Sequence, residues 1–197
     1  MGTRDQILDA AADVMRTRGL ARATTKEIAR AAGYSEATLY KHFDDKPALF
    51  LAVLHERLPS FQPFVAELLK KAGQGTLQEN LAATARSAVE FYRESFPVSA
   101  SVFSEPALLA AHRAAMSRLD AGPHRPVEAV TRYLRAEQQR GRIRPDVDCA
   151  AAASLLLGAC LQHAFLSSFA GRHLGREEAE AYADSIARTL VAGLTDP

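Results

Sequence analysis

The sequence contains almost none of the signals that mark β-structure. It has no sustained alternation of apolar and polar residues, and no Asn-Gly or Asp-Gly pair of the kind that closes a hairpin. Helical spacing of apolar residues recurs along nearly the whole chain, and glycines and prolines punctuate it. We therefore predict an all-α fold.

Cysteine is also scarce. Cys149 and Cys160 are the only two among 197 residues, which excludes a disulfide framework. On one helix they would lie eleven residues apart, too far along the axis to bridge. We expect two buried free thiols, because unpaired cysteine is among the most buried residue types.

Long apolar runs are missing as well. The longest uncharged one, 149–161, is shorter than the ~18 residues expected of a membrane span. The chain begins with a charged amphipathic stretch that does not resemble a signal peptide. We therefore expect a cytoplasmic protein that does not enter a membrane.

The common enzyme motifs do not occur. There is no Glu-x-x-His pair, no His-Glu-x-x-His, no Cys-x-x-Cys, no glycine-rich phosphate loop and no Gly-x-Ser-x-Gly elbow. Glu105 and His112 could share a helical face, but two groups do not make a site. We expect no catalysis and no bound metal or cofactor.

An excess of charge of one sign is absent too. The formal net charge is +1, and residues 1–46 carry eight Lys/Arg against seven Asp/Glu. The net charge therefore does not indicate that the protein binds a nucleic acid. A case for DNA binding has to rest on where the charges lie.

The first 46 residues contain three clear helical segments. The first runs from Arg4 to about Arg18 and ends at Gly19. A second, short helix begins near Thr24, whose spacing to Glu27 is that of a capping box, and ends at Gly33. Ser35 is placed to cap a third helix that we predict to run to Phe43.

Helical patterns continue through the rest of the chain. Asp45 is placed to cap a fourth helix, with Lys46 and Pro47 in its first turn, and Pro59 and Pro63 end or bend it. Further helices are predicted at about 76–95, 105–119, 125–140, 146–170 and 176–194.

Residues 24–46 combine two short helices and a tight turn, which is the pattern of a helix-turn-helix. On a wheel of about 100° per residue, Leu39 and Phe43 nearly coincide and mark the buried side of the second helix. Ala37 and Lys41 then point away from the core, toward a major groove. Small Ala37 permits close approach to the bases, and Lys41 can donate to guanine or to a phosphate.

Polar side chains flank this outward face. Thr38 can bond a phosphate or contact a thymine methyl group, and Tyr40 and His42 can hold phosphates on the groove walls. Lys46 and the start of the second helix lie at helix N-termini, where the dipole favours an anion. The predicted DNA-binding residues are Thr25, Lys26, Ser35, Ala37, Thr38, Tyr40, Lys41, His42 and Lys46.

At these positions the chain resembles the TetR family of bacterial transcriptional regulators. The matching residues are Thr24, Thr25, Ile28, Ala29, Ala32, Gly33, Ser35, Thr38, Leu39, Tyr40, His42, Phe43, Lys46 and Leu49. Tyr34 stands where Val or Ile is commoner in the family, and Ala37 stands where Gly is frequent. Beyond about residue 55 the resemblance is one of architecture.

The resemblance implies a three-helix DNA-binding head, residues 1–46, and a helical-bundle body for effector binding and dimerisation, residues 47–197. It implies a homodimer on a palindromic operator of double-stranded DNA, usually a repressor released by a small molecule. The expected two-fold interface, at about 148–194, would pair two helices with their mates in a four-helix bundle. Its predicted contact residues are Ala151, Leu155, Gly158, Ala159, Gln162, Leu166, Phe169, Tyr182, Ile186, Leu190 and Leu194.

The effector itself cannot be read from the residues. A small-ligand site needs apolar walls with a few polar groups, and such residues occur in the predicted body. The candidates are Phe91, Phe96, Phe103, His112, Met116, Gln162, His163 and Phe169. The alternative is a constitutive or architectural DNA-binding protein without an effector, in which these residues are ordinary core.

Overall fold

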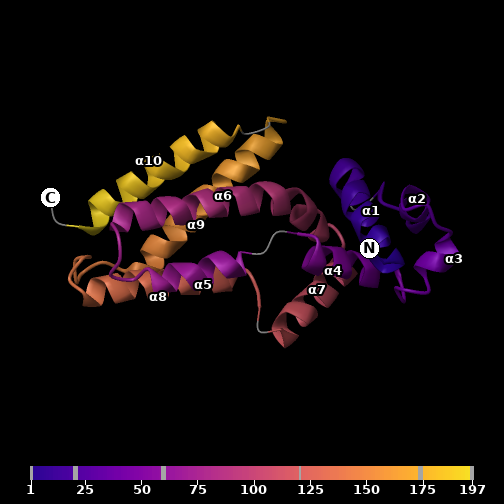
Figure 1. Cartoon of the computed structure of the whole chain (residues 1–197), viewed down its shortest axis with the longest axis horizontal. Helices are drawn as coiled ribbons and strands as arrows, with labels where there is room; N and C mark the ends of the chain where they lie inside the picture. The colour runs from indigo at the N-terminus through magenta and orange to yellow at the C-terminus, as the bar shows by residue number, and fades with distance from the viewer. Residues whose placement is uncertain (1, 20–21, 59–60, 120, 173–174, 196–197) are drawn as a thin grey trace. The chain divides into compact units, whose positions relative to one another are not determined.

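Every element of the structure, a computed structural model, is an α-helix (Figure 1). The structure describes residues 2–19, 22–58, 61–119, 121–172 and 175–195, and no strand occurs within these ranges. The predicted all-α fold is confirmed. The helices are α1 (Thr3–Arg18), α2 (Thr25–Ala31), α3 (Glu36–Leu39), α4 (Lys46–Glu56), α5 (Gln62–Lys70), α6 (Leu77–Val102), α7 (Pro106–Arg118), α8 (His124–Gln139), α9 (Cys149–Phe169) and α10 (Arg176–Leu194).

The helices form two compact units. The first comprises Met1–Pro59 with Glu94–Asp120, and the second comprises Ser60–Arg93 with Ala121–Pro197. Helix α6 supplies residues to both. These two units differ from the two domains that we expect from function, residues 1–46 and 47–197. The functional domain boundary stays a prediction.

The first unit is built around one apolar cluster. The apolar face of α1 is buried, and it meets residues from α2, α3 and α4 together with the end of α6 and the start of α7. This burial of apolar surface is the main favourable contribution to the packing of such short helices. The largest fully buried members are Ile7, Leu8, Met15, Ile28, Leu39 and Leu49.

Helix α6 is longer than predicted. We expected it to end near residue 95, before Pro97, but it continues to Val102. A proline inside a helix removes one backbone hydrogen bond and normally ends the element. Here Val98 and Val102 are both buried in the core of the first unit, and that burial favours continuing the helix.

Helix α5 was not predicted as a separate element. Pro59 and Pro63 correctly indicated a break after the fourth helix, and a new helix begins directly after Phe61. Leu68 is fully buried, and the helix packs against α8 in the second unit. The nine-residue segment was too short for its periodicity to stand out.

The second unit has a core of alanine, leucine and valine side chains in which both cysteines are buried and free, as predicted. The Cys160 thiol is fully inaccessible and donates to the carbonyl oxygen of Ala85 on α6 at 3.7 Å. Burial raises the pKa of this thiol to about 12. The thiolate, which is the reactive form, is therefore strongly disfavoured in the folded protein.

Helix α9 has two different faces. One face is buried in the core of the second unit and includes Ala153, Leu156 and Cys160. The opposite face is exposed yet largely apolar, and Figure 1 shows α10 beside the helix. By length and mean hydropathy, α9 alone among the described helices could cross a membrane, a test that core helices of globular proteins also pass.

A buried carboxylate fixes the end of α8 to the loop before α6. Glu137 is fully buried, and its Oε1 accepts a hydrogen bond of 2.8 Å from the backbone N–H of Gly73. Its Oε2 lies 3.2 Å from Nη1 of Arg142, whose Nη2 donates to the carbonyl of Gly75 at 2.6 Å. A buried charge has to be paired in this way, because its desolvation is costly.

We expect Glu137→Ala to lower the free energy of unfolding by about 1–3 kcal/mol, because the Gly73 amide loses its acceptor and the Arg142 guanidinium loses its ion-pair partner. Urea unfolding followed by circular dichroism measures the change. Glu128→Ala is the matched control on the same helix, since its exposed pair with Arg125 contributes about 0–1 kcal/mol. Equal losses in the two variants would contradict this role for Glu137.

Candidate nucleic-acid interface

The predicted capping box at the start of α2 is present. The Thr24 hydroxyl accepts the N–H of Glu27 at 3.2 Å, and the Glu27 carboxylate accepts the N–H of Thr24 at 3.4 Å. The Thr24 hydroxyl also donates to the Glu27 carboxylate at 3.1 Å, and this bond together with that from the Thr24 N–H lowers the pKa of Glu27. Glu27 also pairs with Arg18 at 2.6 Å. The start of α2 is therefore held in place locally and by α1.

The turn between α2 and α3 depends on Gly33. Its φ of 79° lies in the left-handed region, where a residue with a Cβ would be strained. The N–H of Gly33 donates to Arg30, and that of Tyr34 to Ala29 at 2.9 Å. The Tyr34 hydroxyl donates to the side chain of Gln6, which ties the turn to α1.

Helix α3 is shorter than predicted. It ends at Leu39 instead of Phe43, and the chain continues in tighter turns in which Lys41 donates to Thr38 and His42 to Leu39. The tightening lets Asp45 become extended and cap α4, where its carboxylate accepts the N–H of Ala48 at 2.7 Å. Leu39 and Phe43 still lie on one side, 0% and 5% exposed, so the expected orientation of the buried face is confirmed.

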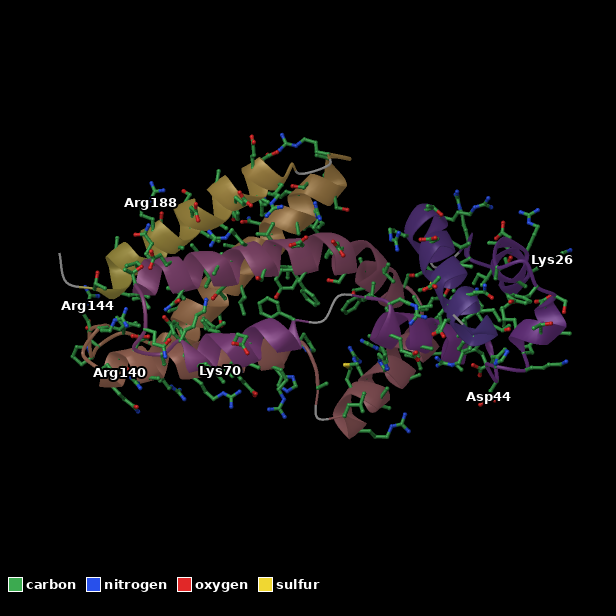
Figure 2. All side chains as sticks on the ribbon, viewed as in Figure 1. Lys26, Asp44, Lys70, Arg140, Arg144 and Arg188 are labelled. Carbon is green, nitrogen blue, oxygen red and sulfur yellow. The ribbon has the colours of Figure 1, made fainter. Side chains whose placement is uncertain are left out.

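Four of the predicted DNA-binding side chains extend into solvent. Lys26, Ala37, Lys41 and His42 are exposed, and none of them has a side-chain hydrogen bond or ion pair within the described residues. Figure 2 labels Lys26, which extends outward from α2. Three basic or imidazole groups around one small residue form a surface that a nucleic-acid backbone could approach.

Four other predicted contacts are hydroxyl groups engaged with each other or with Glu36. Thr25 is buried and donates to the Glu36 carboxylate, and it accepts from the Tyr40 hydroxyl at 3.4 Å. The Ser35 hydroxyl accepts the N–H of Thr38 at 3.2 Å and lies 2.9 Å from the Thr38 hydroxyl. These bonds stabilise the helix-turn-helix, and a DNA contact by the same groups stays a prediction.

Lys46 is the first residue of α4, as the sequence indicated. Its ammonium group lies 5.1 Å from the ring centroid of Phe50, within range of a cation–π interaction. The side chain is half-buried, so its charge lies close to the N-terminal turn of α4.

Ion pairs between α1 and the end of α4 were missed from the sequence. Arg4 donates to both oxygens of Glu56, at 2.8 and 2.7 Å. Arg57 donates to Asp5 at 2.9 Å and to Asp9 at 2.6 Å. The one-turn spacing of the two aspartates was the available signal, since it places both carboxylates on one face of α1.

The predicted effector contacts divide between the two units. In the first, Phe103 is exposed, whereas Phe96, His112 and Met116 are half-buried. In the second, Gln162 and Phe169 are exposed, and Phe91 and His163 are half-buried. The ring of Phe91 lies beside those of Phe61 and Tyr92, and the His163 ring stacks on Tyr182 with 3.8 Å between the ring centroids. Whether these groups form one pocket stays a prediction.

Comparison with known families matches both parts of the chain. Residues 7–53 match the family model described as bacterial regulatory proteins, tetR family. Residues 99–193 match the C-terminal domain of AefR-like transcriptional repressors. The chain belongs to the TetR family.

Curated relatives match part of this TetR-family chain. A helix-turn-helix-type transcriptional regulator of Mycobacterium tuberculosis is 49% identical over 51 residues, which are 26% of this chain and 25% of that protein. The transcriptional activator FasR of Mycolicibacterium smegmatis is 40% identical over 67 residues, 34% of this chain and 31% of FasR. The matches thus span only a quarter to a third of these relatives.

Solved structures with the TetR fold match the whole chain. A TetR-family regulator from Mesorhizobium loti has a TM-score of 0.76 at 22% identity, covering 98% of this chain and 97% of that one. NalD of Pseudomonas aeruginosa has a TM-score of 0.71 at 21% identity, with coverage of 98% and 97%. Family and fold are those of DNA-binding transcriptional regulators and not those of enzymes.

We expect the protein to lose stability as the pH falls from 7 to 5. Burial lowers the pKa values of His55, His112 and His163 below the ordinary value near 6.5, so protonation favours the unfolded chain once the pH drops below that value. Carboxylates titrate mainly below this window. Thermal unfolding at half-unit pH steps measures the loss.

Replacing His55, His112 and His163 together by Gln should flatten this pH dependence. Replacing exposed His124 by Gln should leave it unchanged, because that ring is not buried. A melting temperature that is constant between pH 7 and 5 in the unmodified protein would contradict the lowered pKa values of His55, His112 and His163.

Proposed function

We propose that this regulator is a sequence-specific repressor that binds a palindromic operator as a homodimer and is released by a small-molecule effector. The observation that carries the proposal is the outward set of Ala37, Lys41 and His42, presented by the burial of Leu39 and Phe43. A short recognition segment of this kind fits the width of a major groove.

Separate roles follow for the side chains of this surface. Lys41 is placed to donate to guanine acceptors, and Ala37 leaves room for close approach to the bases. Lys26, His42 and Lys46 are placed to contact phosphates, and such contacts fix the register of the protein without reading sequence. Thr25 joins α2 to α3 through Glu36 and Tyr40, and Ser35 and Thr38 fix the start of α3. The four hydroxyl-bearing side chains offer their hydroxyl groups near the same surface.

A dimer through α9 is supported by its exposed apolar face. Five of the eight large hydrophobic side chains exposed in the described residues lie on this one helix. A concentrated apolar patch of this kind normally marks a protein interface. The five residues, with their exposed fractions, are Leu155 (67%), Leu161 (39%), Phe165 (43%), Leu166 (52%) and Phe169 (83%).

Part of the interface that we predicted on α10 packs within the chain. Tyr182, Ile186 and Leu190 are half-buried against the core of their own unit, and Leu194 is a buried member of that core. The residues that α10 leaves open are small or polar, such as Ser185 and Thr189. We therefore propose that α9 supplies most of the apolar contact and α10 supplies a flank.

Repression and release by an effector are supported by relatives. The C-terminal match is to AefR-like repressors, and NalD is a repressor of a multidrug efflux pump. FadR of Bacillus subtilis, which has a TM-score of 0.67 at 18% identity, was solved in complex with stearoyl-CoA. FasR, an activator, is matched over only 31% of its length. The proposed ligand contacts are Phe91, Phe103, His112, Met116, Gln162 and His163.

The decisive experiment is a titration against labelled DNA from upstream of the protein's own gene, with an unrelated duplex as reference and at several salt concentrations. A specific regulator should prefer its operator by about a thousandfold or more. Equal and steeply salt-dependent binding to every tested upstream fragment and to unrelated DNA would instead indicate an architectural protein.

Single substitutions separate base reading from phosphate contact. We expect Lys41→Ala to weaken operator binding and change base preference, because it removes the donor to guanine. We expect Lys46→Ala to weaken binding to all sequences and to reduce the salt slope by about one. Lys70→Ala, on α5 in the second unit, is the control that should change neither. An unchanged base preference in Lys41→Ala would refute its role as a base reader.

The dimer is tested by placing charge on the open face of α9. We expect the double substitution Leu155→Asp and Leu166→Asp to convert a dimer into a monomer in analytical ultracentrifugation, because two buried carboxylates would lack partners. Leu119→Asp is the matched control at another exposed leucine, 64% accessible in the first unit. A double variant that remains dimeric would place the interface elsewhere.

A further inference from the structure

Two histidines from different helices of the first unit meet between α4 and α7. The ring centroids of His55 and His112 are 5.5 Å apart, with 41° between the ring planes. The helices that carry them pack directly on each other. Each ring has one nitrogen shielded from solvent, Nε2 of His55 and Nδ1 of His112, and neither has a hydrogen-bond partner within the described residues.

Such a pair needs a physical explanation. A buried polar atom without a partner costs free energy, so it usually marks a bound water, an ion or a functional site. The rings do not hydrogen-bond to one another, which leaves both shielded nitrogens free to bind a third species. Neutral imidazole is the commonest protein ligand of zinc, copper and nickel.

We propose that His55 and His112 form a binding site for a divalent late first-row transition metal ion that bridges α4 and α7. Two imidazoles on one tetrahedral ion, with metal–nitrogen bonds of about 2.0–2.1 Å, place their ring centroids roughly 5 Å apart. The observed 5.5 Å is close to that separation. We expected no metal because the common metal-binding motifs do not occur in the sequence, and His55 and His112 are far apart along the chain.

The surroundings of the pair are consistent with a metal ligand set. Burial keeps both pKa values low, so protons compete weakly with a metal at neutral pH. Glu56, beside His55, is engaged with Arg4 and is not available as a ligand. Met116 lies one helical turn after His112 and is half-buried, which places a thioether on the same face of α7.

The site is predicted to be incomplete without solvent. No group of three or more His, Cys, Asp or Glu suited to a metal occurs in the described part of the chain. Water would therefore complete the coordination shell. An ion bound in this way would fix α4, the helix that follows the helix-turn-helix in the chain, to α7. The site does not depend on the proposed function, because metal binding is measured without DNA.

The test is isothermal titration calorimetry of the full-length, untagged protein with Zn²⁺, Ni²⁺ and Mg²⁺. We expect one Zn²⁺ or Ni²⁺ per chain and no binding of Mg²⁺, which prefers oxygen ligands. His55→Phe and His112→Phe keep a planar ring in each place but remove its nitrogens. Each should weaken Zn²⁺ and Ni²⁺ binding by at least about tenfold.

His163→Phe is the matched control, because this half-buried ring also has a shielded nitrogen without a partner but stacks on Tyr182 instead of on a histidine. It should bind metal as the unmodified protein does. Zn²⁺ should also raise the melting temperature of the unmodified protein and of His163→Phe, but not that of the other two variants. Absence of Zn²⁺ and Ni²⁺ binding, or equal binding by all three variants, would overturn the proposal.

Discussion

The position of the proposed DNA-binding surface depends on the burial of two side chains, Leu39 and Phe43. Helix α3 has only four residues, and an isolated helix of that length is not stable in water. Its conformation is therefore imposed by packing into the core that α1, α2 and α4 share. Ala37 and Lys41 face outward because these two residues face inward. A cavity at Leu39 would disturb recognition without removing any DNA contact.

Two kinds of interaction stabilise the helices around Leu39 and Phe43. The turn at Gly33 and the caps at Thr24, Ser35 and Asp45 fix the entry and exit of the short helices through local hydrogen bonds. The ion pairs of Arg57 with α1 act over a longer range and connect the first helix to the end of α4. Local and long-range constraints thus agree on one geometry, as expected of a well-specified fold.

The helix caps and the glycine turn could be predicted from the sequence, whereas the contacts between residues far apart in the chain could not. A capping box or a turn glycine can be recognised from about four consecutive residues, so α2 and its turn were predicted correctly. The extent of α6 past residue 97 depends on burial of Val98 and Val102 in a core that the local pattern does not reveal. The meeting of His55 and His112 is likewise a property of tertiary packing, which one sequence does not encode in any local spacing.

Apolar periodicity has a related limit in α9 and α10. The same spacing suggested that both helices present an apolar stripe to a partner, but the stripe of α10 covers its own core whereas that of α9 is open. Periodicity identifies a face that avoids water. It does not say which molecule covers that face.

The buried thiol of Cys160 has a practical consequence. Its sulfur is inaccessible, and its pKa of about 12 leaves almost no thiolate at neutral pH, so alkylating reagents cannot modify it while α9 remains packed. The rate at which an alkylating reagent labels Cys160 therefore reports how often the second unit opens, just as amide hydrogen exchange reports local unfolding. Cys160 can therefore serve as a built-in probe of local unfolding in the second unit.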